Sequence, residues 1–555
     1  MTPAGKRTLA AGLLAAGALH AAIARDTVVG GMNDDAVYLL LARALRSGRY
    51  VLPDGIARPI TSYWPGAPAL WALPAWLCAP RWGLCRLAAL AAAWAGLWQV
   101  WRLARRQLRT ESAAAVVTLA AFSPVFAANV GVCGADIAFL ALSTAAFAAL
   151  PDGRAARRSE RLALTACAAA AALFRPEGLL LVAALALSVY WSEGSRRAAR
   201  FSAVALLPAL AWIARNRLVA GTASSYIRQF ASQVVPLANP LMMLEQCARL
   251  IALLFGGGML GLTRGPLAVA AGLLILAAAG VGTVVSLRRH RDPRALALAV
   301  FVFAALILHV LWRQVLDRYL LIVLVPVLVL CARAAEEIPA RAAAAAASLI
   351  FLLGAAGDAR TLAQGRPGAE PWPQTMSYVR ARLPPDVLIQ SPIAPVLMLW
   401  TGRRAIALIS TVYRRDQWLA ICLENHVDYL VLDDNPEHWD RMPGPWLAMI
   451  VRLNRWADSS PYVVVQFRNA AEKTAVYRIA HPDPARYLRA WNAFRIAMTE
   501  SPTPAVARAR LREAVKLEPE LASARLALSS LESGPAAAED RRRAIASDPT
   551  LASAD

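Results

Sequence analysis

The sequence predicts an α-helical polytopic membrane protein, followed by a small extracytoplasmic α/β domain and a helical C-terminal segment. Of its 555 residues, 58% are hydrophobic and only 17% are charged, which is far from the composition of soluble domains. Apolar runs long enough to cross a hydrocarbon core of ~30 Å recur up to about residue 356 and then stop. We therefore expect three domains, over residues 1–356, 357–480 and 481–555.

Arginine clusters between the apolar runs are the source of much of the formal net charge of +22. Because cytoplasmic loops carry the excess of Lys and Arg, each cluster marks that side of the membrane. The charge therefore indicates topology and no nucleic-acid partner. Threading the runs between the clusters gives about eleven transmembrane helices in a bacterial inner (plasma) membrane, with a cytoplasmic N-terminus and a periplasmic C-terminal domain. The expected spans are 8–24, 84–102, 112–131, 136–151, 161–174, 177–192, 201–218, 266–287, 295–312, 318–333 and 341–356.

Two further apolar stretches, 63–80 and 241–262, fall in outer loops of this topology. Their Pro, Gly and aromatic content favours helices that lie in the membrane interface or re-enter it, where they would roof a cavity at the outer leaflet. The first span could instead be the core of a signal peptide behind Lys6-Arg7. We favour an uncleaved span, since cleavage would leave the acidic pair described below just inside a new N-terminus.

After residue 361 the composition changes to short strands and helices. The runs 384–390, 405–409, 428–433 and 462–467 are typical of strands, and helices are expected near 373–382 and 415–425. Beyond Pro482 the chain is Ala-rich and helical in pattern. The segment KLEPELASA at 516–524 recurs as ASDPTLASA at 546–554, which resembles the tail of a tetratricopeptide unit. With barely two copies, it predicts a docking element or a cap.

An acidic pair, Asp34-Asp35, opens the first outer loop. Carboxylates at a membrane surface are costly and usually functional. The residues that follow, 36–45, predict a short amphipathic helix that would hold both carboxylates against the outer face. Other polar groups are expected at the same depth, at the outer ends of later spans and in outer loops: Asp136, Arg175, Glu177, Asn216, Arg217, Tyr226, Arg228, Arg313, Arg318 and Tyr319.

This mixture of carboxylates and arginines suits the transfer of a sugar from a polyprenyl phosphate. The phosphate of such a donor lies among the outer headgroups, so its transferase needs a carboxylate base for the acceptor and cations for the departing phosphate. We expect Asp34 to take the acceptor proton and Asp35 and Asp136 to be further catalytic carboxylates. The candidates for binding the donor phosphate are Arg175, Arg313, Arg318, Tyr319, Arg217, Tyr226 and Arg228, with Glu177 and Asn216 as other site residues.

The order of these motifs also resembles a known family. The run NDDAVYLLLARAL at 33–45, the loop YWPGAP at 63–68, the span start ADIAFL at 135–140, the turn FRPEG at 174–178 and the span start DRYLL at 317–321 resemble the landmarks of GT-C-fold glycosyltransferases. The nearest groups are the protein O-mannosyltransferase-like and lipid A aminoarabinose-transferase-like enzymes. The resemblance implies a GT-C membrane domain, a polyprenyl-phosphate-sugar donor and a base at Asp34. Two motifs depart from it: relatives often have Tyr-Pro-Pro where this chain has Tyr63-Trp64-Pro65, and usually a Ser or Thr before the second acid, where this chain has Ala135.

Each candidate also has a purely structural interpretation. Asp34 and Asp136 could be helix caps, and Asp35 could be a first-turn charge that suits the helix dipole. Arg175 and Glu177 could simply pair across a turn, whereas Arg318 and Tyr319 could be interfacial anchors. Tyr226 and Arg228 could contact only each other. We expect His309, within an apolar run, to be a hydrogen-bonded core residue.

Two other function classes compete with an inverting hexosyl- or pentosyltransferase. A transporter or flippase for lipid-linked sugars would need discontinuous helices and polar residues at the midplane, whereas polarity here collects at the outer ends of the spans. A non-catalytic adaptor would use the C-terminal segments to bind a partner. The acceptor could be a glycan, a lipid or a protein. A divalent cation, Mg or Mn, could assist at the carboxylates, but no His or Cys cluster supports zinc.

Overall fold

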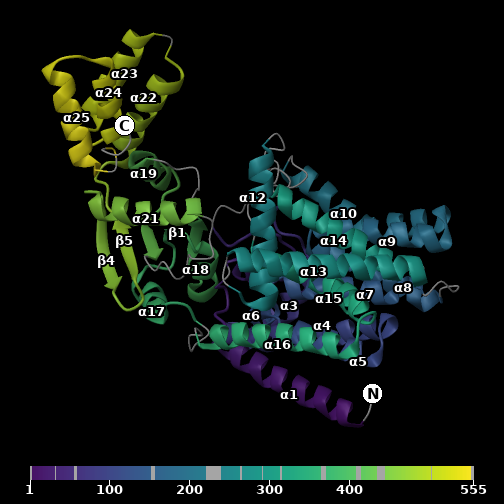
Figure 1. The fold of residues 1–555 in the computed structure, drawn as a ribbon. Helices are drawn as coiled ribbons and strands as arrows, with labels where there is room; N and C mark the ends of the chain where they lie inside the picture. The colour runs from purple at the N-terminus through teal and green to yellow at the C-terminus, as the bar shows by residue number, and fades with distance from the viewer. Residues whose placement is uncertain are drawn as a thin grey trace. The chain divides into compact units, whose positions relative to one another are not determined.

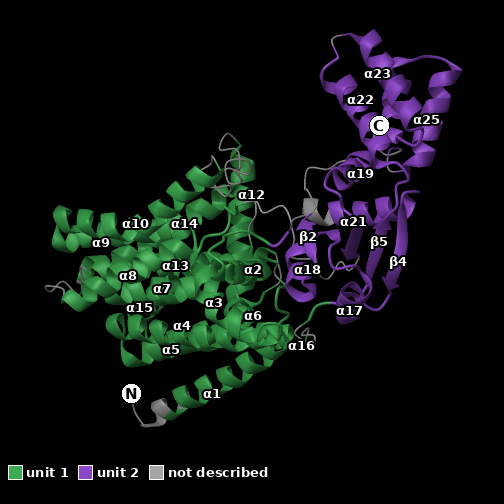
Figure 2. Cartoon of the chain, turned by 180° about the vertical axis from the view of Figure 1, so that it is seen from behind, with its two compact units in different colours: residues 1–52, 58–371 green, residues 53–57, 372–555 purple. Residues whose placement is uncertain are grey.

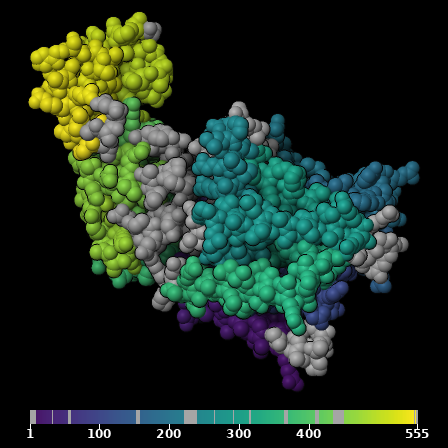
Figure 3. Space-filling view, in the orientation of Figure 1, coloured from purple at the N-terminus to yellow at the C-terminus, as the bar shows by residue number. Residues whose placement is uncertain are grey.

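Helices dominate the computed structural model of the chain (Figure 1), which describes residues 3–31, 33–54, 59–151, 157–220, 239–262, 265–290, 292–312, 316–363, 370–407, 414–433, 444–501, 503–549 and 551. The chain divides into two compact units (Figure 2), and Figure 3 draws its described residues as a space-filling surface in the orientation of Figure 1. The first comprises residues 1–52 and 58–371, and the second comprises 53–57 and 372–555. The boundary expected at 356 falls inside the last long helix of the first unit.

The described residues contain eight helical stretches long and apolar enough to cross a membrane. The expectation of a helical polytopic membrane protein is thus confirmed. Seven of the eight coincide with expected spans. They are α1 (Pro3–Asp26), α4 (Cys85–Gln107), α10 (Ser195–Ala220), α13 (Pro266–Val285), α14 (Pro293–Leu311), α15 (Leu320–Ala335) and α16 (Ala340–Ala363).

The other expected spans correspond to shorter helices. These are α5 (Thr110–Ala121), α6 (Pro124–Asn129), α7 (Asp136–Ala149), α8 (Arg158–Phe174) and α9 (Glu177–Glu193). The expectation of one helix over 112–131 is wrong, because the chain ends α5 at Ala121 and starts α6 at Pro124. Proline lacks the N–H that would continue the ladder of α5, but it is well suited to a first helical position.

The two stretches expected in outer loops are helical. The first forms α3 (Gly66–Cys78). The second forms α12 (Pro240–Ile251), which continues into a wider π-helical segment, η2 (Ala252–Met259). By length and composition, α12 with η2 is the eighth stretch able to cross a membrane. In Figure 1, α12 runs across the direction of α13 and α16, which differs from the orientation of those two long helices. Whether α12 crosses the membrane or lies in its interface is not decided by length and composition, so the interfacial placement stays a prediction.

The core of the first unit surrounds α15. Every residue from Leu320 to Leu330 is buried, as expected for a helix that is apolar on all sides. Neighbouring helices contribute large aromatic side chains, including Phe139, Phe147 and Phe301, to the same core. A short 3₁₀ turn, η4 (Asp317–Tyr319), precedes α15. The central helix therefore fixes the position of Arg318 and Tyr319.

The second unit contains a five-stranded mixed sheet with the order β2-β1-β3-β5-β4. Its strands are β1 (Leu388–Ser391), β2 (Arg404–Ala407), β3 (Tyr429–Asp433), β4 (Val463–Asn469) and β5 (Thr474–Ile479). β1 pairs in parallel with β2 and β3, whereas β5 pairs antiparallel with β3 and β4. The helices α17 (Pro373–Arg382), α18 (Ala394–Thr401), α19 (Arg415–Glu424) and α21 (Gly444–Ser459) belong to the same unit. The expected α/β region is confirmed, with β5, α18 and α21 in addition to the predicted elements.

The C-terminal segment is helical, as expected, and consists of α22 (Pro484–Thr499), α23 (Pro504–Leu517), α24 (Ala522–Leu531) and α25 (Pro535–Ser547). Its apolar residues join those of the sheet in one core, which includes Trp418, Leu430, Tyr487 and Leu511. Asp416 of α19 accepts a hydrogen bond of 2.7 Å from the backbone N–H of Ser523, in the first turn of α24. The helical segment is therefore packed on the sheet as part of one unit. Its relation to tetratricopeptide repeats stays a prediction.

Candidate active site

The acidic pair lies at the start of α2 (Asp34–Arg46), directly after a tight turn. Gly30 and Asn33 both have positive φ, of 88° and 63°, and the Gly30 N–H donates to Asp35 Oδ2 at 2.7 Å. This contact holds the Asp35 side chain, in a residue that is only 1% exposed, against its own turn. Asp34 points elsewhere and its side chain is 31% exposed. The two carboxylates thus have different surroundings: Asp35 is held within the turn, and Asp34 is presented by it.

Asp34 contacts two groups that are distant in the sequence. Arg318 Nη2 donates to Asp34 Oδ2 at 2.6 Å, and the Tyr63 hydroxyl donates to Asp34 Oδ1 at 3.0 Å. Burial, followed by the charge of Asp34, raises the pKa of the Tyr63 hydroxyl well above its ordinary value, so the phenol keeps its proton and remains a donor. The residue at the N-cap position of α2 is Asn33, and its side chain makes no capping hydrogen bond. The alternative that Asp34 only caps α2 is therefore not what this geometry shows.

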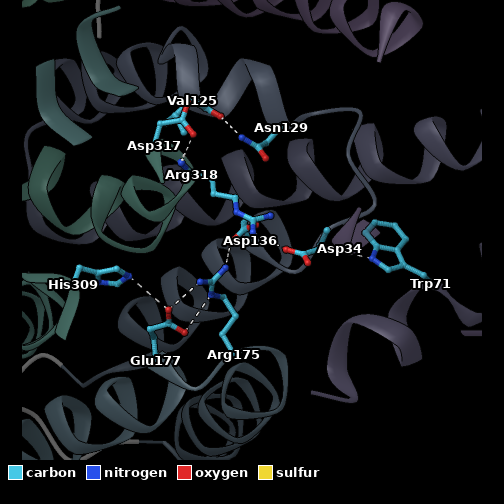
Figure 4. A network of polar contacts seen from close by, with 11 residues as sticks. Asp34, Trp71, Val125, Asn129, Asp136, Arg175, Glu177, His309, Asp317 and Arg318 are labelled. Atoms are coloured by element: carbon cyan, nitrogen blue, oxygen red, sulfur yellow. Dashed lines mark hydrogen bonds and ion pairs between the residues drawn. The ribbon is translucent and has the colours of Figure 1, made fainter. Parts of the chain in front are cut away.

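A second cluster lies beside the first and is built around Arg175 (Figure 4). Arg175 forms two parallel hydrogen bonds with Glu177, of 3.2 Å from Nε and 2.9 Å from Nη2, and its Nη1 bonds Asp136. All three residues are buried. His309 also contacts this cluster, with its Nε2 atom 3.7 Å from Glu177 Oε1. The other ring nitrogen, Nδ1, is hydrogen-bonded to the Ala305 carbonyl at 2.7 Å. Arg175 and Glu177 do pair across their turn, and the same arginine also neutralises Asp136.

Tyr319 joins the two clusters. The Arg175 guanidinium lies 5.5 Å from the centre of the Tyr319 ring, and the His309 ring lies 4.7 Å from it. Arg318, the preceding residue, carries the contact to Asp34. In Figure 4 the side chains of Asp34, Asp136 and Arg318 lie close together, with Arg175 on one side and Trp71 on another. The structure therefore brings together six of the expected site residues from four separate parts of the sequence: Asp34, Asp136, Arg175, Glu177, Arg318 and Tyr319.

Two glycines allow the segments that carry these residues to approach closely. At Gly66, a Cβ atom would lie 2.5 Å from the Phe174 ring and 2.7 Å from the Leu173 carbonyl oxygen, directly before Arg175. At Gly178, a Cβ atom would lie 2.4 Å from Ala172 Cα. Trp71 Nε1 also donates to the Gly134 carbonyl at 3.2 Å, which ties α3 to the turn before Asp136. The glycines of the YWPGAP and FRPEG motifs thus have a packing role.

Replacing Gly66 by alanine is expected to destabilise the protein by about 1–3 kcal/mol, because α3 must move away from α8 to relieve the overlap. Thermal unfolding in detergent measures the change. The matched control is Gly12→Ala in α1, where a Cβ atom meets nothing within 4 Å. Equal unfolding midpoints for both variants would contradict the close approach seen at Gly66.

The remaining predicted residues lie apart from these clusters or outside the described residues. Asn216 is buried and donates to the Thr61 carbonyl at 3.4 Å, whereas Arg217 is exposed. Tyr226, Arg228 and Arg313 lie outside the described residues. Sequence reasoning did not assign a role to the Tyr63 hydroxyl or to Arg215, which donates to the Ile60 carbonyl at 2.9 Å. Tyr63 is the first residue of the YWPGAP motif, and this motif is the sequence signal that could have pointed to it.

The carboxylates of the site do not fit a metal ion. Within the part of the chain that the structure describes, no group of three or more His, Cys, Asp or Glu residues lies together as a metal site. Asp34 and Asp136 are each paired with an arginine. The divalent cation, Mg or Mn, that could assist at these carboxylates therefore finds no set of ligands among the described residues.

Comparison with solved structures identifies the architecture. ArnT from Cupriavidus metallidurans bound to undecaprenyl phosphate matches with a TM-score of 0.59 and 14% identity, covering 87% of this chain and 100% of that one. The apo form of ArnT matches with a TM-score of 0.55 and 16% identity, covering 86% and 98%. This chain has the fold of the GT-C membrane glycosyltransferases. The resemblance inferred from the motifs is thereby confirmed at the level of the fold.

A more distant GT-C structure extends the comparison. The Archaeoglobus fulgidus oligosaccharyltransferase tethered to an acceptor peptide matches with a TM-score of 0.51 and 12% identity, covering 86% of this chain and 74% of that one. No protein-family profile matches the sequence, and no curated protein matches it either. The GT-C assignment therefore depends on the three-dimensional fold, since identities in this range show fold alone.

Proposed function

We propose that this chain is an integral-membrane glycosyltransferase that moves a sugar from a polyprenyl-phosphate donor to an acceptor. The observation that carries the proposal is the contact of 2.6 Å between Asp34 Oδ2 and Arg318 Nη2. It joins a carboxylate that can accept a proton to a cation that can bind a phosphate. A GT-C structure of similar fold was solved with undecaprenyl phosphate, a polyprenyl lipid, which supports the choice of donor.

Arg318 is the cation best placed to bind the donor phosphate. Its Nε is buried and has no hydrogen-bond partner among the described residues, so the guanidinium keeps donor capacity beyond its bond to Asp34. Arg175, in contrast, directs Nε, Nη1 and Nη2 to carboxylates. In the proposed site, Arg175 positions and neutralises Asp136 and Glu177, whereas Arg318 is the phosphate ligand.

The proposed reaction is a single displacement that inverts the sugar carbon. An acceptor hydroxyl attacks C1 of the sugar, the bond from C1 to the phosphate oxygen breaks, and the proton of the hydroxyl passes to Asp34. The departing polyprenyl phosphate keeps the electron pair and its negative charge, which Arg318 neutralises. In the state described here, Asp34 and Arg318 are paired. Binding of the phosphate to Arg318 would weaken that pair and leave the carboxylate to the acceptor.

The proposed topology is the one expected from the basic clusters. The N-terminus lies in the cytoplasm, the α/β unit lies on the periplasmic face, and the site opens at the outer leaflet. This orientation lets the lipid chain of the donor remain in the bilayer while its phosphate reaches Arg318. The acceptor is a hydroxyl of a glycan, a lipid or a protein.

The test is a transfer assay in proteoliposomes with a panel of radiolabelled polyprenyl-phosphate sugars and membrane acceptors. The proposal predicts that one donor loses its label to an acceptor and releases polyprenyl phosphate in equal amount. Movement of intact labelled lipid across the bilayer without transfer would instead identify a flippase. Neither transfer nor movement with any donor, despite a folded protein, would favour a non-catalytic adaptor.

A further inference from the structure

The outer-loop segment Ile60–Tyr63 is anchored from behind by the last turns of α10. Arg215 Nη1 donates to the Ile60 carbonyl at 2.9 Å and to Asn216 Oδ1 at 2.9 Å. Asn216 Nδ2 in turn donates to the Thr61 carbonyl at 3.4 Å. Two consecutive side chains of one helix therefore hold two consecutive carbonyls of this segment.

Aromatic rings fix the Arg215 side chain. Its guanidinium carbon lies 4.8 Å from the centre of the Trp212 ring and 5.4 Å from that of Tyr50. The two rings lie edge to face, with their centres 4.9 Å apart. Cation–π contacts with two rings orient a planar guanidinium more firmly than a compact ammonium group. Tyr50 then extends the anchor, because its hydroxyl donates to the Tyr63 carbonyl at 3.1 Å.

On its other side, the same segment contacts Asp34, the proposed general base. The Tyr63 hydroxyl donates to Asp34 Oδ1 at 3.0 Å, and the Tyr38 ring lies edge to face against Tyr63 at 5.5 Å. Among the described contacts, Arg215 is thus connected to Asp34 through Ile60 and Tyr63 of the segment and through Tyr50. Three hydrogen bonds therefore hold the backbone carbonyls of Ile60, Thr61 and Tyr63. Because the backbone is held, the Tyr63 side chain has little freedom of position.

We infer that Arg215 is a positioning residue for Asp34, acting through the Tyr63 hydroxyl. The inference rests on the proposed function, since it assigns Arg215 to the placement of the proposed base. In this inference Arg215 acts through the segment, and not through a contact of its own with the donor or the acceptor. It holds the Ile60–Tyr63 segment so that the hydroxyl fixes one oxygen of Asp34, while Arg318 holds the other. Small displacements of a reacting group are sufficient to reduce rates strongly.

The test compares Arg215→Lys, Tyr63→Phe and the double variant in the transfer assay, with the full chain in proteoliposomes. Lysine keeps the charge but loses the planar stack, and phenylalanine removes only the hydroxyl. Each single variant is expected to lower kcat by about 10-fold with the donor KM unchanged. The double variant is expected to be no slower than the slower single variant, because both changes remove the same contact. Arg49→Ala, an exposed arginine of the same loop, is the matched control and is expected to leave kcat unchanged.

Two outcomes overturn the inference. One is a double variant whose loss is the product of the two single losses, which is the signature of independent structural effects. The other is a change confined to the donor KM. If Arg215→Lys fails to fold, Tyr50→Phe replaces it, because that variant removes only the bond to the Tyr63 carbonyl. Failure of the proposed function looks different: Asp34→Asn would then retain full transfer, whatever the behaviour of Arg215→Lys.

Discussion

Replacing Asp34 by asparagine is expected to lower kcat for sugar transfer by about 10²–10⁴-fold, which is the usual contribution of a general base. The amide cannot accept the acceptor proton, but it has nearly the same shape as the carboxylate. Its oxygen can still accept the hydrogen bond from Tyr63, which spans 3.0 Å in the wild type. The loss should therefore appear in kcat, measured by release of labelled sugar from the donor at saturating concentration.

Donor binding is the internal control for Asp34→Asn. The variant keeps Arg318 and removes a negative charge that competes for it, so the affinity for polyprenyl phosphate should be equal to or higher than that of the wild type. A thermal unfolding midpoint close to the wild-type value shows that the site still assembles. Full transfer activity in a folded variant would eliminate Asp34 as the base.

Replacing Arg318 by glutamine is expected to weaken binding of polyprenyl phosphate by about 10²-fold, since a hydrogen bond to a charged group is worth ~1.5–3 kcal/mol. The variant also leaves Asp34 without its cation, although Tyr63 still donates to it. Titration of a fluorescent polyprenyl phosphate in detergent micelles measures the affinity. The two variants therefore separate the roles: Asp34→Asn loses turnover and keeps the donor, whereas Arg318→Gln loses the donor.

The double variant Asp34→Asn with Arg318→Gln is the control for stability. Breaking an ion pair in a partly desolvated site costs more than replacing both partners by neutral groups. We expect the double variant to unfold at a higher temperature than Arg318→Gln alone, yet to remain inactive. Undiminished binding of polyprenyl phosphate to either variant that lacks Arg318 would assign the phosphate to another cation.

Local sequence patterns predicted much of the fold. The pattern of residues 373–382 indicated a helix, and α17 spans Pro373–Arg382. The basic clusters and apolar runs located seven of the long helices, because membrane spans are read from local composition. The strands β1 to β4 were expected near their observed positions. Strand β5 and helix α18 were missed, since TAVYRI and APVLMLWT give short apolar signals without a distinctive period.

The pairing of the site residues could not be predicted in the same way. Asp34 and Arg318 are 284 residues apart, so their contact depends on how the start of α2 and the turn η4 are brought together in three dimensions. The sequence indicated that carboxylates and arginines share one depth, yet gave no reason to assign Arg318 to Asp34 and Arg175 to Asp136. The packing roles of Gly66 and Gly178 likewise appear only when neighbouring backbones are placed. The acidic pair was the strongest signal, and the structure distinguishes its two members: Asp35 supports the turn, and Asp34 faces the site.

The central claim is that Asp34 and Arg318 divide the work of base and phosphate ligand at one site. A cryo-EM structure of the chain with bound polyprenyl phosphate tests it most directly. We predict phosphate oxygens within hydrogen-bond distance of the Arg318 guanidinium, with the contact of 2.6 Å to Asp34 lengthened and the carboxylate turned to the space an acceptor would occupy. A phosphate bound away from Arg318, with the Asp34–Arg318 contact intact, would contradict the claim.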